Sequence, residues 1–246
     1  MKTASRVIPI RDLQMPPVTM AVPPLVDGDH LSVAEFLRRY KAMPQLKKAE
    51  LIEGVVHVSS AVSIDHGGPH ARFIIWLGYY WSVTPGTELL DNTTAILDLG
   101  ENCPQPDGCL RILPEYGGRS RTSKNRFVEG APELAGEIAV SSASYDLHEK
   151  HRAYQRNGVQ EYLVWRVEDA VIDWFGLHGA TYRPLAMRNG LLKSKVFPGL
   201  WLDAPALIQG KWARVLEVVH QGLASDEHRR FVARLVKQEK NGERGA

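Results

Sequence analysis

The chain has 246 residues, of which 44% are hydrophobic and 24% are charged, an ordinary composition for a globular protein with a full core. The formal charge of +2 is too small to indicate a nucleic-acid partner by itself. No run of residues is long and apolar enough to span a membrane, and no signal peptide is apparent, so we expect a cytoplasmic protein. The two cysteines, Cys103 and Cys109, lack histidines at a zinc spacing and do not favour a disulfide, so we expect them to be structural.

The first residues predict an extended segment followed by a capped helix. Residues 1–27 are rich in proline and valine, as in an extended or disordered lead-in. Ser32 is suited to be the N-cap of a helix over 33–41, because Glu35 stands three residues later and completes a capping box. The folded part of the chain is therefore expected to begin near residue 28.

The rest of the chain alternates strand and helix patterns. Residues 50–60 predict a hairpin with its tight turn at Glu53-Gly54, and residues 66–81 carry apolar and aromatic residues at helical spacing. The elements predicted after these are strands over 87–99, 107–113 and 133–140, a helix over 146–155 that Gly158 stops, strands over 161–166 and 170–177, further strand residues around the Asn189-Gly190 turn of 182–202, and helices over 205–222 and 226–240. We infer one α/β core, residues 28–204, with a helical C-terminal appendage, residues 205–246.

Carboxylates recur beside the predicted strands, and a lysine follows the last of them. Glu50 opens the first hairpin, Asp107 opens a strand, Glu137 lies within an apolar strand, and Lys150 stands on the next helix. An acid in an apolar strand is costly to bury unless a positive charge compensates it. A divalent cation is the usual compensator, and Mg²⁺ keeps positions open for water and phosphate oxygens. The pattern therefore suggests metal-assisted hydrolysis of a phosphodiester.

The stretch 130–165 makes this pattern more specific. It combines an apolar strand that carries Glu137, a serine-rich turn, a helix, and a closing Gly-Val-x-Glu-Tyr segment. The helix carries, at turn spacing, Asp146, Lys150 and Tyr154. Tyr154 is expected to pack rather than to act in catalysis.

Three features precede that stretch in the same order: ELIEG at 50–54, His66 at the start of the next helix, and Pro106-Asp107. The ordered set, over roughly residues 32–202, resembles the Uma-type (Uma-two) restriction endonuclease family, a branch of the PD-(D/E)xK nuclease superfamily. The resemblance implies a restriction-endonuclease-like fold, in which helices flank a mixed sheet. It also implies hydrolysis of DNA that depends on Mg²⁺ or Mn²⁺.

The resemblance assigns roles to four residues. It implies that Asp107 and Glu137 hold the metal ion, with Glu50 as a further ligand or as an orienting group. In the superfamily's common form the lysine stands two residues after the acid, where this chain has Ala139. The resemblance places the lysine at Lys150 instead, where it would orient the attacking water or neutralise charge on the pentavalent intermediate. The catalytic set implied is therefore Glu50, Asp107, Glu137 and Lys150.

Two positions differ from the family's pattern. The Ser-Pro-Ser/Thr turn that usually follows the acidic strand is Ser141-Ser142-Ala143 here, so its proline is missing. Gly136 stands before Glu137, where a β-branched residue is more usual. Both changes are expected to loosen the site locally. A catalytically inactive binding module on the same fold, and a metal-dependent hydrolase of another phosphate ester, are therefore alternatives.

The sequence says less about partners. Five basic residues could clamp a DNA backbone, although a solvated loop is an equally good interpretation. They are Arg111, Arg119, Arg121, Lys124 and Arg126. A homodimer is also compatible with cutting both strands of a duplex. Apolar residues at helical spacing within 212–237 need a partner surface, either in a dimer or on the chain's own core.

Overall fold

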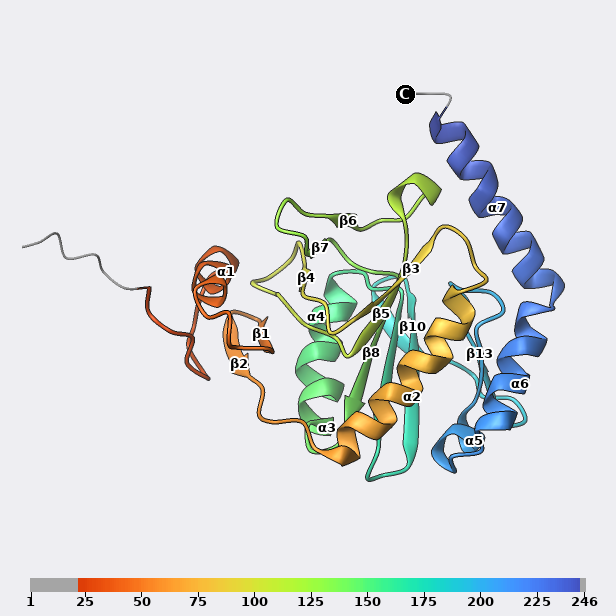
Figure 1. The fold of residues 1–246 in the computed structure, drawn as a ribbon, viewed down its shortest axis with the longest axis horizontal. Coiled ribbons are helices and arrows are strands. Elements are labelled where there is room, and N and C mark those ends of the chain that lie inside the picture. The colour runs from red at the N-terminus through yellow and green to blue at the C-terminus, as the bar shows by residue number, and fades with distance from the viewer. Residues whose placement is uncertain (1–21, 244–246) are drawn as a thin grey trace, which may run out of the picture.

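The computed structural model describes residues 22–243, with side chains described to residue 240 (Figure 1). The lead-in predicted for residues 1–27 therefore lies almost wholly outside the described residues. Within the described part of the chain, no helix has the length and apolar character needed to cross a bilayer. Cys103 and Cys109 are both buried with free thiols.

A six-stranded mixed sheet forms the centre of the molecule. In spatial order its strands are β11 (Thr181–Pro184), β10 (Val171–His178), β9 (Glu161–Arg166), β8 (Leu134–Ala139), β5 (Gly108–Ile112) and β3 (Thr87–Asp91). Strands β8 and β9 run parallel, whereas the other neighbouring pairs are antiparallel. A parallel pair needs a crossover connection, and here a helical segment supplies it. The predicted α/β fold with a mixed sheet is confirmed.

Helices cover both faces of this sheet (Figure 1). On one face, Phe73 and Trp76 of α2 (Ile64–Trp81) share a buried cluster with Leu134 and Leu163 of the sheet. The crossover between β8 and β9 covers the other face, where Tyr154 packs with Ala135. The crossover consists of α3 (Ala143–Tyr145), a π-helical segment η3 (Asp146–Lys150) and α4 (His151–Arg156).

The N-terminal elements form a small unit beside the sheet, at the left of Figure 1. They are α1 (Val33–Lys41), β1 (Ala49–Ile52) and β2 (Val55–Val58). The Ser32 side chain caps α1 as predicted, because its hydroxyl accepts a hydrogen bond from the Glu35 N–H. The predicted tight turn is also present: Glu53 and Gly54 have φ values of 53° and 79°.

The remaining elements lie around this frame. They are β4 (Ala95–Ile96), η2 (Pro114–Tyr116), β6 (Arg121–Thr122), β7 (Val128–Glu129), β12 (Leu191–Lys193), β13 (Trp201–Asp203), α5 (Ala204–Ile208), α6 (Trp212–Leu223) and α7 (Asp226–Glu243). Two predicted elements are interrupted. The strand predicted over 87–99 ends at Asp91, because Asn92 adopts a left-handed φ of 45°. The helix predicted over 205–222 breaks at Gly210, whose φ is 69°.

The C-terminal helices pack on the chain itself. Val215 and Val219 of α6 share the core cluster of α2 with Phe231 and Leu235 of α7. The apolar residues that the sequence left in need of a partner therefore have one within the same chain. They do not supply a surface for a dimer.

Candidate functional site

Two neighbouring strands bring Asp107 and Glu137 together. Strand β5 begins at Gly108, which pairs with Gly136 of β8 in antiparallel register. Asp107, just before Gly108, and Glu137, just after Gly136, therefore lie opposite each other on the same face of the sheet, and the Ile138 N–H donates to Asp107 Oδ2 at 2.8 Å. This face is the one that the helical crossover covers.

The ring of Phe73 explains why the paired positions 108 and 136 are both glycine. A Cβ atom on Gly136 would stand 2.2 Å from Phe73 Cζ, and one on Gly108 would stand 2.9 Å from Phe73 Cε1. A β-branched residue at position 136 would therefore collide with α2. The sequence suggested that Gly136 loosens the strand. In the structure, Gly136 instead lets α2 pack closely against the strand that carries Glu137.

Lys150 lies at the centre of three carboxylates. Its ammonium nitrogen is 2.9 Å from Glu50 Oε2, 3.0 Å from Glu137 Oε1 and 3.6 Å from Asp146 Oδ1. The short turn after β8 aims Lys150 back at Glu137. Lys150 belongs to the π-helical segment η3, and such segments are rare and gather at functional sites.

Other side chains hold this cluster in place. The Tyr154 hydroxyl donates to Glu137 Oε1 at 3.0 Å, so this tyrosine contacts the site as well as packing. The Ser142 hydroxyl donates to Asp146 Oδ2 at 2.5 Å. The Gln105 N–H donates to Glu50 Oε1 at 2.6 Å. Each carboxylate around Lys150 therefore has a fixed orientation.

A second cluster surrounds Asp107. Lys48 Nζ is 2.7 Å from Oδ1, and His66 Nε2 is 3.1 Å from Oδ2. His70 Nε2 lies 2.8 Å from the Asp107 carbonyl oxygen and 3.0 Å from Asp91 Oδ1. The two histidines stand one helical turn apart on α2 and both face Asp107.

Charge is unevenly balanced across the two clusters. Glu50, Asp107, Glu137 and Asp146 are each at most 4% exposed. When all four are ionised, four negative charges face the two positive charges of Lys48 and Lys150, which leaves a formal charge of −2. A buried excess of charge is costly, and protonation or a bound cation would relieve it.

The carboxyl pKa values reflect this imbalance. Burial raises the pKa of Glu137 to about 8, because Lys150 offsets only part of the desolvation and three other carboxylates oppose ionisation. Burial also raises the pKa of Asp107, but the His66 hydrogen bond and the charge of Lys48 outweigh it, so that pKa lies well below its ordinary value. Asp107 thus favours its anionic form, whereas the cluster favours a proton on Glu137, and a bound cation would favour the ionised form of Glu137.

The lysines stay charged. Burial lowers the pKa of Lys150, but Glu137, Glu50 and Asp146 raise it well above its ordinary value. Burial likewise lowers the pKa of Lys48, and Asp107 and Glu137 more than offset that effect. Both ammonium groups can therefore act as permanent positive charges beside the acids.

The two clusters line one cavity of about 410 Å³, which we call the carboxylate cavity. Its walls include Lys48, Glu50, Asp107, Glu137, Asp146 and Lys150. His57 Nε2 and the Tyr145 hydroxyl on its walls are buried without a hydrogen-bond partner in the described part of the chain. Such polar atoms are available to a ligand.

The sequence did not identify three of these side chains. Lys48 stands two residues before Glu50, so strand alternation alone places it on the same face. His70 follows His66 by one helical turn, which is also a readable signal. Asp146 was noted only as part of the helix motif, although it lines the cavity at 3% exposure.

The five basic residues of the predicted clamp differ in exposure and pairing. Arg111 is 4% exposed and pairs with Glu88. Arg119 donates to the Gly158 carbonyl, and Arg121 pairs with Glu129 across the β6–β7 hairpin. Only Arg111 is used inside the fold; Arg119 and Arg121 are exposed and bonded at the surface, and Lys124 and Arg126 form no ion pair in the described part of the chain.

The residues fit a hard divalent cation in chemistry and in charge. Carboxylate oxygens are the donors that Mg²⁺ and Mn²⁺ prefer, and the excess of two negative charges matches one such ion. Both contacts of Glu137 involve Oε1, so Oε2 is the oxygen available to a metal ion. Within residues 22–243, however, no three His, Cys, Asp or Glu side chains are gathered closely enough to hold a metal as they stand. Lys48 would therefore have to leave Asp107 Oδ1 when a metal ion binds.

Comparison with solved structures defines the class of fold. The chain is similar to a crystal structure from Anabaena variabilis described as a "putative nuclease belonging to DUF820", with a TM-score of 0.54 and 12% sequence identity. The match covers 72% of this chain and 99% of that one. The architecture is therefore that of a nuclease-type fold. No protein with a curated description matches this sequence.

The sequence comparison gives the family. The model of the Uma2 family, described as "Putative restriction endonuclease", matches residues 33–205, which is most of the chain. The chain belongs to this family, as its ordered motifs predicted. The family and the fold together support a nuclease.

Proposed function

We propose that the chain is a metal-dependent endonuclease that hydrolyses phosphodiester bonds of DNA in the carboxylate cavity. The observation that carries this proposal is the charge balance of that cavity. Four buried carboxylates face two lysines, so ionisation of all four leaves an excess of two negative charges, which one divalent cation would offset. Asp107 and Glu137 would hold Mg²⁺ or Mn²⁺, and Glu50 would be a further ligand or an orienting group.

A bound divalent cation would lower the pKa of a water molecule and stabilise negative charge on the phosphate. The chain's own residues supply the rest. Asp107 is ionised at every ordinary pH, because His66 and Lys48 hold its pKa low. A bound cation would favour the ionised form of Glu137. Its hydrogen bond from Tyr154 keeps the carboxylate oriented in either state.

Lys150 is the proposed catalytic cation. Its ammonium is fixed by Glu50 and Glu137 at 2.9 and 3.0 Å, so it requires no reorganisation when charge develops on a phosphate. From this position it would orient the attacking water or stabilise the pentavalent intermediate. Removal of such a preorganised charge typically lowers the rate by a factor of about 10²–10³.

One observation favours the alternative of an inactive binding module. Lys48 pairs with Asp107, and Lys150 pairs with Glu50 and Glu137. A degenerate site would use lysines to neutralise its acids in this way. The two hypotheses differ in whether a cation displaces Lys48 from Asp107.

Cleavage assays on varied DNA, with Mg²⁺, Mn²⁺ or EDTA, test the proposal. Wild type should cut only with metal. Lys150→Ala should lose cleavage and keep much of its metal binding, because the lysine is not a ligand, whereas Glu137→Gln should lose both. Equal cleavage by wild type and Lys150→Ala would remove the lysine from the mechanism. No cleavage by wild type under any condition would favour the binding module.

A homodimer that relates two sites by a twofold axis would suit cleavage of both strands of a duplex. It stays a prediction, and it requires a surface other than the packed faces of α6 and α7. Sedimentation that shows only monomer at high protein concentration would rule it out. We also propose a cytoplasmic location and a division of the chain into a core, residues 28–204, and a C-terminal appendage, residues 205–246.

A further inference from the structure

A second cavity, of about 390 Å³, adjoins the carboxylate cavity and shares Asn92 with it. We call it the basic cavity. It is built by the end of α1, the loop before β1, the loop after β3, and the β6–β7 hairpin. Its walls include Tyr40, Lys41, Lys47, Asn92, Arg126 and Phe127.

Three positive charges line the basic cavity without compensation. Lys41, Lys47 and Arg126 are exposed, and none of them forms an ion pair with a carboxylate in the described part of the chain. This differs from the neighbouring cations Lys48 and Arg121, which are paired with Asp107 and Glu129. Three unpaired cations at one cavity favour an anionic occupant.

The backbone is unusual at two points of the same wall. Arg126 has a φ of 65° and Asn92 a φ of 45°, both in the left-handed region. Asparagine adopts that region readily, but arginine does so seldom. The turn fixes Arg126 through the hydrogen bond from its N–H to the Ser123 carbonyl. Residues held in such conformations gather at binding sites.

Hydrogen bonds join the floor of the basic cavity to the carboxylate cavity. Gln105 Nε2 donates to the Asn92 carbonyl at 2.8 Å, and the Tyr40 hydroxyl donates to Gln105 Oε1 at 3.1 Å. The backbone N–H of the same Gln105 holds Glu50 at 2.6 Å. An occupant of the basic cavity would therefore lie in a fixed position relative to the acids.

The chemistry of the walls points to a nucleotide. Three cations suit phosphates, and the ring of Phe127 offers a surface for a base. A cavity of about 390 Å³ takes a group of small-molecule size, and a base could stack on Phe127 only if it were not stacked within a duplex. Given the nuclease function above, we propose that the basic cavity binds one unpaired nucleotide of the strand that is cut. The substrate is then single-stranded or locally unpaired DNA.

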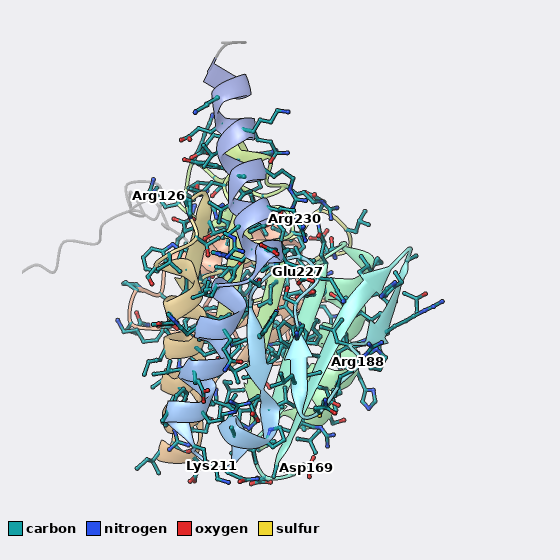
Figure 2. The ribbon with its side chains drawn as sticks, turned by 90° about the vertical axis from the view of Figure 1, so that its right-hand side faces the viewer. Arg126, Asp169, Arg188, Lys211, Glu227 and Arg230 are labelled. Carbon is teal, nitrogen blue, oxygen red and sulfur yellow. The ribbon has the colours of Figure 1, made fainter. Side chains whose placement is uncertain are left out.

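The test is binding of a fluorescently labelled oligothymidylate of about 12 nucleotides, and of a blunt duplex, measured by fluorescence anisotropy in EDTA. The variant Lys41→Ala/Lys47→Ala/Arg126→Gly removes the three charges, and glycine accepts the φ of position 126. The control, Arg188→Ala/Lys211→Ala/Arg230→Ala, removes three exposed cations that form no ion pair in the described part of the chain. They lie on the side that faces the viewer in Figure 2, away from α1.

The cavity variant should bind the single strand at least about tenfold more weakly than wild type, and the slope of log K against log salt should become shallower by about 2. The control should bind as wild type does, and wild type should prefer the single strand to the duplex. Phe127→Leu should weaken binding without changing the slope, since no charge is lost.

Two outcomes would overturn the proposal: equal effects of the cavity variant and the control, or a duplex that binds as tightly as the single strand. Neither depends on cleavage, because the binding is measured without metal. A protein that binds as proposed but never cuts would overturn only the proposed function. Unfolding curves for each variant confirm that the surface changes leave the fold intact.

Discussion

Replacing Glu137 by glutamine should stabilise the metal-free protein, although the same change should abolish cleavage. Glutamine keeps the shape of the side chain and its contact with Tyr154 but removes one of the excess buried charges. In wild type, the folded protein holds the Glu137 proton up to about pH 8, whereas the ordinary pKa is 4.5. As pH rises from about 5 to about 8, the unfolded chain releases this proton while the folded protein keeps it. The metal-free wild type therefore loses stability over this range.

The size of this effect follows from the same pKa. Each unit of pKa corresponds to 1.36 kcal/mol, so a rise from 4.5 to about 8 makes ionisation cost at most about 5 kcal/mol. The glutamine variant does not incur this cost. Its advantage over wild type in EDTA should be small near pH 5 and should grow to a few kcal/mol above pH 8.

Urea unfolding of both proteins in EDTA, across this pH range, measures the difference. Glu161→Gln is the matched control, because Glu161 is also buried but accepts hydrogen bonds from the Ser194 hydroxyl and from the Lys195 and Val196 N–H groups. That change should destabilise by about 1–3 kcal/mol, since an amide cannot accept all three. If Glu137→Gln unfolds more easily than wild type above pH 8, Glu137 is a structural partner of Lys150 and the excess-charge account fails.

Two further predictions concern the metal and the strand geometry. Mn²⁺ or Mg²⁺ should raise the thermal midpoint of wild type by binding the native state, and Asp107→Asn should remove most of that gain. An undiminished shift in the variant would show that Asp107 is not a metal ligand. Gly136→Ala should destabilise by about 1–3 kcal/mol, because its Cβ would stand 2.2 Å from Phe73 Cζ. Gly67→Ala, on α2 with only Val62 Cγ1 near the new Cβ, at an ordinary contact distance of 3.9 Å, should instead stabilise by about 0.5–1 kcal/mol, and equal effects of the two changes on urea midpoints would contradict this account of Gly136.

The acidic strands could be predicted because each carries its own signal. The apolar runs around Asp107 and Glu137 are short and contiguous, and the turn after Glu137 leaves Lys150 little freedom to point elsewhere. The mixed sheet and the family followed from the order of these motifs. Predicting the sheet and the family required no information about contacts between distant parts of the chain.

The partners of the acids depended on contacts that local sequence does not encode. Lys48 and Asp107 are 59 residues apart in the chain, and Arg111 is used by Glu88 across a strand pair. Local charge density therefore overstated the number of unpaired cations in the basic loop, and it did not reveal that Lys48 pairs with Asp107. Gly136 shows the same limit, since the ring that requires it belongs to a helix some sixty residues earlier.

The central claim is that the carboxylate cavity binds a divalent cation between Asp107 and Glu137. A crystal of the wild type grown with Mn²⁺, with diffraction recorded at an anomalous wavelength, tests it most directly. The account predicts an anomalous peak that both carboxylates contact, with the Lys48 ammonium displaced from Asp107 Oδ1. Lys48 still paired with Asp107, with no peak between the two acids, would contradict it.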